Sequence, residues 1–484
     1  MNLNSWKLEN SYADLPSKFY TSIKPSPVKA PELIIFNKKL AKSLDITLPH
    51  DDKKILARLF SGNDLPETFS PIAQAYAGHQ FGHFSILGDG RAHLIGEHIS
   101  PNGTRFDVQF KGSGQTPYSR NGDGRAALAQ MLREYIISEA MHALNIPSTR
   151  SLAVVLSGES IMRSSMVKGA ILTRVASSHI RVGTFEYANK MLDLEDLKAL
   201  ADYAIARHYP ELVDEENPYL SLLKAVITNQ AKLIASWMHV GFIHGVMNTD
   251  NMAISGETID YGPCAFMDIF SMGQVFSSID KLGRYNYGSQ AHVAHWNLTK
   301  LAESLLPLLD KNIDKAIKMA EVVVNEYASE FNTAWISGMR FKLGFFEEEE
   351  GDFKLAQSLL EWMESSKADY TETFRDLAYE NLSENEIYKS SAFKKWHSLW
   401  QARLSRNSKL IKSSLSMMRK YNPVIVPYNH LVEEALSAAE GGDMQPFYKL
   451  LSALERPFEF SSSNEVFLNS TVEPKPYYKT FCGT

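Results

Sequence analysis

Residues 241–262 read GFIHGVMNTDNMAISGETIDYG, and this stretch carries the most specific polar spacing in the chain. Asn251 falls seven residues after His244, and an Asp-Tyr-Gly triplet begins at Asp260. An amide oxygen and a carboxylate oxygen are hard ligands, suited to Mg²⁺ or Mn²⁺ that bridges phosphates. If adjacent strands bring Asn251 and Asp260 together, the pair forms such a metal site. The alternative is a strand-turn-strand in which both residues only shape turns.

The segment 82–111 carries the clearest strand pattern in the first half of the chain. Three short apolar runs are separated by a GDGR turn at 88–91 and by a Pro-Asn-Gly turn. This predicts a meander of three antiparallel strands. Apolar and polar side chains alternate in the last run, so the Lys111 ammonium should be presented on the polar face rather than packed.

A glycine-rich polar segment, GSGQTPYSRNGDG, comes next and leads into a predicted amphipathic helix at about 125–144. Asp123 is placed where an N-cap residue would lie. Glu134 falls in the middle of this helix, beside its apolar stripe. The helix therefore offers one carboxylate close to the strand that ends in Lys111.

Two further apolar runs, at 151–156 and 169–175, are rich in β-branched residues and should complete an antiparallel sheet. From residue 192 onward the pattern is mostly helical. One long helix is predicted at about 219–239, ending at Gly241. The chain is therefore expected to be α+β, with its sheet in the first half and helices in the second.

This order of parts is that of a protein kinase, in which a glycine turn covers the nucleotide. A lysine on the third strand holds phosphate oxygens there, and a glutamate on the next helix pairs with it. Lys111 and Glu134 occupy these two positions. Taken singly, each feature is also explained by an ordinary hairpin turn or by solvated surface charge. The complete order predicts a protein-kinase-like bilobal fold, with a small antiparallel-sheet N-lobe and a large, mainly helical C-lobe. The expected divisions are an N-terminal extension at 1–80, the N-lobe at 81–180, the C-lobe at 181–300 and a helical extension at 301–484.

The segment departs from the kinase pattern at the catalytic base. Val246 stands two residues after His244, where a kinase has its catalytic aspartate, and a valine cannot accept a proton. The nearest carboxylate in the loop is Asp250, which can act as the base from another direction. Such a displaced base indicates a substrate or nucleotide that is oriented differently in the cleft.

Two arginines add positive charge that a kinase does not need at this place. Arg174 lies in the last predicted strand and Arg181 just beyond it. Together with Lys111 and Arg91, they can stabilise a departing pyrophosphate, because guanidinium groups suit phosphate oxygens. In the alternative, each arginine pairs with a nearby acid, for example at position 159 or 186.

The bulk properties of the chain narrow its class. Its 484 residues are 44% hydrophobic, enough for two or three packed units, and its net charge of -6 gives no footprint for nucleic acid or anionic lipid. We find no signal peptide at the start and no apolar run of about twenty residues that would span a bilayer. Two cysteines, Cys264 and Cys482, are too few for a disulfide framework. We expect a cytoplasmic protein without a nucleic-acid or membrane partner.

Three long stretches of the sequence resemble one known family. They are AQAYAGHQFGHFSILGDGRA at 73–92, FKGSGQTPYSRNGDGRAAL at 110–128 and HGVMNTDNMAISGETIDYGPCAFMD at 244–268. These stretches closely resemble the selenoprotein O family of pseudokinase-fold protein adenylyltransferases, and the resemblance covers nearly the whole chain. It implies transfer of AMP from ATP, and also of UMP from UTP, to Ser, Thr or Tyr hydroxyls of other proteins. The family binds its nucleotide flipped relative to kinases, in agreement with the displaced base.

The resemblance also implies roles for individual residues. Asp250 would be the proton acceptor, and Glu134 the partner of Lys111. Asn251 and Asp260 would hold Mg²⁺ or Mn²⁺. The nucleotide contacts would be Gly88, Gly90, Arg91, Lys111, Asp123, Gly124, Arg174, Arg181 and Asp260. Many members end in a redox motif built on cysteine, whereas this chain has only Cys482 in its tail, so a redox switch would have to use Cys264 or a thiol of another molecule.

Two alternatives remain on the sequence alone. The first is a kinase that transfers the γ-phosphate and uses Asp250 as its base. The second is an inactive scaffold that binds ATP without turnover. A scaffold has no physical need for several charged and polar groups converging on phosphates, which disfavours the second alternative.

Overall fold

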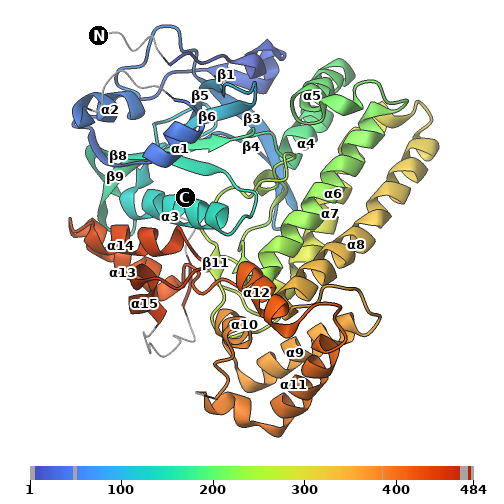
Figure 1. Cartoon of the computed structure of the whole chain (residues 1–484). Coiled ribbons are helices and arrows are strands. Elements are labelled where there is room, and N and C mark those ends of the chain that lie inside the picture. Colours follow the sequence, from blue (N-terminus) through green and yellow to red (C-terminus); the bar gives the residue numbers. More distant parts are fainter. Residues whose placement is uncertain (1–5, 47–51, 384, 469–477, 481–484) are drawn as a thin grey trace.

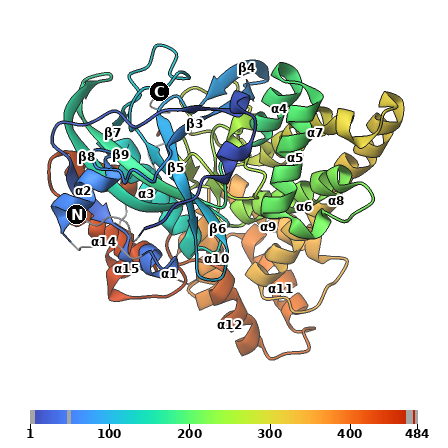
Figure 2. The ribbon, with the colours of Figure 1, turned by 90° about the horizontal axis from the view of Figure 1, so that it is seen from above.

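The computed structural model of the chain describes residues 6–46, 52–383, 385–468 and 478–480 (Figure 1). It confirms the α+β class. A large antiparallel sheet lies beside the helical part of the chain. In both views the helices from α4 (Val182–Met191) to α8 (Ile313–Leu343) lie on one side of the sheet, and α4 packs against β3 (Ile72–Gln80) (Figure 1, Figure 2). The strands of this sheet are β1 (Tyr20–Ser22), β2 (Glu32–Phe36), β3 (Ile72–Gln80), β4 (His83–Gly88), β5 (Ala92–Ile99), β6 (Arg105–Lys111), β7 (Ala126–Ala127), β8 (Arg150–Met162) and β9 (Met166–Ala176).

The sheet follows the order β1-β3-β5-β6-β9-β8-β2, with β4 added to β3 and β7 to β9. The predicted pair of strands at 151–156 and 169–175 is confirmed as the longer hairpin β8–β9. Three strands, β1 to β3, come from the first 80 residues and join the same sheet. The N-terminal part of the chain therefore completes the sheet that carries Lys111.

The predicted meander is wrong in the pairing of its first strand. β4 pairs with β3 and not with β5, whereas β5 pairs with β6 as predicted. The cause is a two-residue turn between β3 and β4, because Phe81 and Gly82 both have positive φ, at 52° and 89°. This backbone suits the right-handed twist of a tight hairpin. The GDGR segment is consequently a connection between β4 and β5, and not the turn of a hairpin.

Helix α3 (Leu128–Ala143) begins later than predicted. The preceding residues Ala126 and Ala127 form β7 and pair with β9, so the N-cap of the helix is Ala127 and not Asp123. The predicted apolar stripe is buried, with Leu128, Met131, Leu132 and Tyr135 all in one core cluster. The sheet pairing thus sets the start of the helix, and the apolar stripe sets its orientation.

The second half of the chain is helical, as predicted. The long helix α6 (Pro218–His239) confirms the prediction at 219–239, and Gly241 follows it with φ 70°. Helices α13 (Asn429–Glu440) and α14 (Gln445–Leu454) return to pack on α3, so the C-terminal part lies beside the sheet (Figure 1). The other helices are α1 (Lys38–Ser43), α2 (Lys53–Phe60), α4 (Val182–Met191), α5 (Leu194–His208), α7 (Gln290–Leu309), α8 (Ile313–Leu343), α9 (Asp352–Ser366), α10 (Tyr370–Tyr379), α11 (Ser391–Leu404), α12 (Ile411–Tyr421), α13 (Asn429–Glu440), α14 (Gln445–Leu454) and α15 (Ser462–Leu468). Across the described part of the chain, none of these helices has the length and apolar character needed to cross a membrane.

Candidate active site

Strand β6 separates an apolar face from a polar face, as its sequence predicts. Val108 and Phe110 pack into the core that contains α2. Asp107, Gln109 and Lys111 are also buried, but on the opposite face, where each meets polar partners. The expectation that the Lys111 ammonium is unpacked is therefore wrong, because two carboxylates surround it.

Lys111 pairs with Glu134 of α3, which confirms the predicted proximity of these two side chains. The same ammonium lies 2.8 Å from Oδ1 of Asp260. Arg174 of β9 reaches that carboxylate oxygen at 2.6 Å. Side chains that are up to 149 positions apart in the sequence thus converge on one carboxylate, Asp260.

Arg181 approaches the same carboxylate from the other side. Its guanidinium lies 3.9 Å from Oδ2 of Asp260 and 3.8 Å from Oδ1 of Asp89. It also stacks over the Tyr76 ring, with its central carbon 4.3 Å from the ring centroid. Two of its buried nitrogens, Nε and one terminal nitrogen, have no hydrogen-bond partner among the described residues. Arg181 therefore keeps donors free for anionic oxygens.

Three cationic side chains surround Asp260. Burial alone would raise the pKa of the Asp260 carboxyl, but the charges of Lys111, Arg174 and Arg181 hold that pKa well below its usual range. The backbone of Asp260 lies in the left-handed region, with φ 63°. Such a conformation is uncommon for a residue other than glycine, and it is typical of functional loops. Asp260 is therefore an ionised carboxylate held in a fixed place.

The alternative that each arginine pairs with an acid is confirmed, because Arg174 and Arg181 both pair with Asp260, but the two acids named as examples are wrong. Glu159 pairs with Arg125, and Glu186 pairs with His79. The positive charge of Arg174 is therefore directed at Asp260, and that of Arg181 at Asp260 and Asp89.

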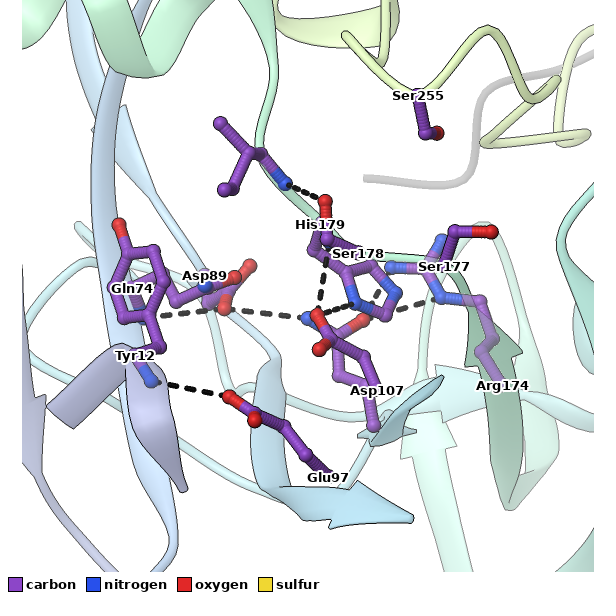
Figure 3. A network of polar contacts seen from close by, with 12 residues as sticks. Tyr12, Gln74, Asp89, Glu97, Asp107, Arg174, Ser177, Ser178, His179 and Ser255 are labelled. Carbon is purple, nitrogen blue, oxygen red and sulfur yellow. Dashed lines mark hydrogen bonds and ion pairs between the residues drawn. The ribbon is translucent and has the colours of Figure 1, made fainter. Parts of the chain in front are cut away.

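A buried polar network connects this cluster to the glycine turn (Figure 3). Asp89, between the two turn glycines, accepts hydrogen bonds from the Gln74 backbone and from the Gln109 side chain. Gln109 in turn accepts a hydrogen bond from Nε of Arg174 at 3.2 Å. Sequence reasoning missed Asp89 and Gln109. Their signals were a carboxylate inside the GDGR turn and an amide two residues before Lys111.

The glycine turn lies under the glycine-rich segment that follows β6. A Cβ at Gly88 would come within 2.8 Å of the Tyr118 Cβ, and one at Gly90 would lie 2.8 Å from the Tyr118 carbonyl oxygen. The Arg91 carbonyl accepts a hydrogen bond from the Gly112 amide at 2.7 Å. These contacts bring the predicted nucleotide-binding residues of the turn next to residues 112–124.

Asp123 and Gly124 lie at the C-terminal end of the glycine-rich segment 112–124. The Asp123 carboxylate accepts the Arg125 amide at 2.9 Å and pairs with Arg163 from the β8–β9 hairpin at 2.8 Å. Gly124 has φ 68°, and a Cβ there would overlap the Gly114 carbonyl group. Only glycine fits this backbone and this space, so the segment has a single local conformation.

Asp250 lies on a short 3₁₀ turn, Thr249–Asn251, that packs between β3 and α4. Its carboxylate is buried, and Oδ1 has no hydrogen-bond partner among the described residues. Burial raises the pKa of Asp250 to about 6, although its own backbone amide and the charge of Arg181 act in the opposite direction. A carboxylate with one unpartnered oxygen and a raised pKa suits a general base near neutral pH.

Asn251 follows directly, and its amide nitrogen donates to the Val246 carbonyl at 2.9 Å. That bond fixes the amide so that its oxygen remains as an acceptor. His244 connects this loop to the Asp260 segment, because its Nε2 lies 2.8 Å from the Ile259 carbonyl oxygen. In the part of the chain that the structure describes, no three His, Cys, Asp or Glu side chains group as metal ligands. The metal site of Asn251 and Asp260 therefore stays a prediction. Its donors would be an amide oxygen, a carboxylate and phosphate oxygens, and such hard donors fit Mg²⁺ or Mn²⁺.

The thiol of Cys264 is buried, and burial raises its pKa to about 12. A protonated, inaccessible thiol reacts slowly. Cys482 lies outside the described residues.

Comparison with known proteins identifies the family. A family described as "Protein adenylyltransferase SelO" matches residues 2–455. A "Protein nucleotidyltransferase YdiU" from Nitrosococcus oceani is 55% identical over 480 residues, which cover 99% of this chain and 97% of the relative. Relatives with the same name from Bacillus cereus (55%, covering 100% and 99% of the two chains) and Brevibacillus brevis (54%, covering 99% and 98%) are similar throughout. Together with the convergence of Lys111, Glu134 and Asp260 predicted from the family motifs, these matches show that the chain belongs to the SelO family of protein nucleotidyltransferases.

Proposed function

We propose that this chain transfers AMP from ATP to Ser, Thr or Tyr hydroxyl groups of other proteins in the cytoplasm, and that UTP serves as a second donor. The family match supports the nucleotidyl transfer. The single structural observation that carries the proposal is the cluster of Lys111, Arg174 and Arg181 around Asp260, close to a base that is not where a kinase has one. Such a cluster neutralises the charge of a leaving pyrophosphate.

In the proposed reaction, the acceptor oxygen forms a bond to the α-phosphorus, and the bond from that phosphorus to the oxygen bridging to the β-phosphate breaks. Pyrophosphate leaves with the electron pair of that bond. Asp250 takes the proton of the hydroxyl group. A divalent metal held by Asn251 and Asp260 would supply Lewis-acid stabilisation of phosphate oxygens. Lys111, Arg174 and Arg181 orient the phosphates, and Glu134 fixes Lys111.

We also infer the kinase-like bilobal arrangement, with an N-lobe at 81–180, a C-lobe at 181–300 and a helical extension at 301–484. The N-terminal extension at 1–80 contributes strands β1 to β3 to the sheet of the N-lobe. The strand that carries Lys111, the helix that carries Glu134 and the helical part after Arg181 support the bilobal arrangement. Gly88, Gly90, Arg91, Asp123 and Gly124 would cover the nucleotide in this arrangement.

Labelled ATP decides between the possible reactions. With ATP labelled at the α-phosphate, we expect label to be retained on acceptor protein, and with ATP labelled at the γ-phosphate we expect none. Intact mass of the acceptor should rise by one AMP unit. Label from the γ position alone would instead establish a kinase, and retention of neither label together with ATP binding would establish an inactive scaffold.

The pKa of Asp250 predicts the acid side of the pH profile. The base must be ionised, so kcat/KM should rise with pH through about 6 and reach a plateau above it. An ordinary aspartate would give this rise near pH 4. The measurement is kcat/KM for acceptor protein between pH 5 and 8, with the fold checked at each pH by circular dichroism. A profile that is flat down to pH 5 would exclude Asp250 as the titrating base.

A further inference from the structure

Thr249, the residue before Asp250, has its hydroxyl group fixed on both sides. Its Oγ1 accepts the His79 backbone N–H at 2.7 Å, and it donates to Oε2 of Glu186. The other oxygen of Glu186 pairs with the His79 ring nitrogen Nδ1. Thr249, His79 and Glu186 thereby close a ring of hydrogen bonds between the Asp250 loop, β3 and α4.

The ring is buried. Glu186 is 1% exposed and Thr249 0%, and the His79 ring packs edge-on against Phe84 and Trp296. A buried carboxylate that accepts two hydrogen bonds costs far less free energy than one without partners. The interactions inside the ring therefore depend on one another, and loss of one leaves polar atoms without partners.

The same two elements also confine Asp250 itself. Gly78, next to His79, leaves no space for a Cβ beside the Asp250 side chain. Gly183, one helical turn before Glu186, is equally confined, because a Cβ there would overlap the Ala77 carbonyl oxygen and lie 3.3 Å from the Asp250 Cα. β3 and α4 thus contact Asp250 through two glycines and hold its neighbour Thr249 through two polar side chains. We call the three hydrogen-bonded residues His79, Glu186 and Thr249 the Asp250 clamp.

We propose that Glu186, Thr249 and His79 are positioning residues that place Asp250 for proton transfer, and this inference rests on the function proposed above for Asp250. None of the three contacts the cation cluster around Asp260 in the hydrogen bonds and ion pairs described. Their loss should therefore change the chemical step and leave nucleotide binding intact. A shift of a catalytic group by about 1 Å costs on the order of 100-fold in rate.

Thr249→Val is the decisive variant, because it preserves the shape of the side chain and removes both hydrogen bonds. We expect kcat to fall by about tenfold to 100-fold, with the KM for ATP changed less than twofold. Thr249→Ser, which keeps the hydroxyl, should recover most of kcat. The kcat of Glu186→Gln should lie between those of Thr249→Val and Thr249→Ser, because an amide keeps only one acceptor oxygen.

Thr173→Val is the matched control. Thr173 is equally buried, but its hydroxyl makes no hydrogen bond among the described residues, and it faces away from the site on β9. We expect Thr173→Val to keep the kcat of the wild type. Melting temperatures of all variants separate loss of fold from loss of rate.

A double-mutant cycle separates positioning from general support of the fold. In an Asp250→Asn background there is no base to position, so Thr249→Val should reduce the residual rate less than twofold. If Thr249→Val lowers the rate equally in both backgrounds, or keeps the kcat of the wild type, these residues do not position Asp250. Failure of the wild type to transfer α-phosphate label would instead refute the proposed function, so the two failures are distinguishable.

Discussion

Replacement of Asp260 by asparagine is expected to lower kcat/KM for nucleotide transfer by about 1,000-fold or more. The carboxylate is the shared partner of Lys111, Arg174 and Arg181, and an amide cannot neutralise them. Loss of one preorganised charged group at such a site costs on the order of 100-fold to 1,000-fold, and loss of the proposed metal ligand would add to this. The measurement is kcat/KM for acceptor protein, obtained from transfer of α-phosphate label at saturating ATP.

Asp352→Asn provides the matched control for this variant. Asp352 is 1% exposed at its side chain and accepts hydrogen bonds from Arg340 at 2.9 Å and Arg403 at 2.7 Å, far along the chain in the helical part. Breaking such a buried ion pair destabilises a protein by about 3 to 5 kcal/mol. Both variants should therefore melt at lower temperature, but only Asp260→Asn should lose activity per folded molecule. Folded Asp260→Asn enzyme with more than one tenth of the wild-type rate would contradict the assigned role.

The sequence correctly predicted those features of the fold that follow from the spacing of apolar residues within a single strand or helix. The alternation in β6 placed Lys111 opposite the apolar face, and the apolar stripe of α3 identified its buried side. The long helix α6 was found within one residue of its ends. Each of these features follows from the strand or helix periodicity of apolar residues, which can be read directly from the sequence.

Pairing between distant segments could not be read in the same way. The hairpin of β3 and β4 depends on Phe81 adopting positive φ, which sequence statistics do not favour for phenylalanine. The start of α3 depends on β7 pairing with β9, about 40 residues further on. Both errors arose where tertiary pairing overrode local preference.

The candidate site shows the same division. Motif spacing identified Lys111, Glu134 and Asp260, whose contacts the structure confirms. It did not reveal that Lys111 is buried, because the partners that cover it come from α3 and from the segment before β11 (Ala265–Phe266). Glu186 belongs to no motif, and its hydrogen bond to Thr249, on which its proposed role rests, is seen only where α4 meets the Asp250 loop.

Gly78→Ala is expected to lower kcat by on the order of 100-fold while the protein remains folded. A Cβ at Gly78 would lie within 2.8 Å of both Cβ and Cγ of Asp250, and closer still to its Oδ1. The overlap involves the root of the side chain and not only its flexible end, so rotation of the carboxylate cannot relieve it. The backbone of Gly78 does not lie in the left-handed region. The alanine therefore acts by displacing Asp250 and not by straining its own strand.

Gly351→Ala is the control, because the Gly351 backbone has φ -75° and a Cβ there meets no atom within 4 Å. Alanine lowers the conformational entropy of the unfolded chain, so this variant should be as stable as the wild type or slightly more stable. Steady-state kinetics with α-labelled ATP should then show loss of kcat at position 78 alone, with the KM for ATP unchanged, because Lys111, Arg174 and Arg181 are untouched. If Gly78→Ala keeps the wild-type kcat, Asp250 can be displaced without cost, and the hydroxyl proton must pass to another acceptor.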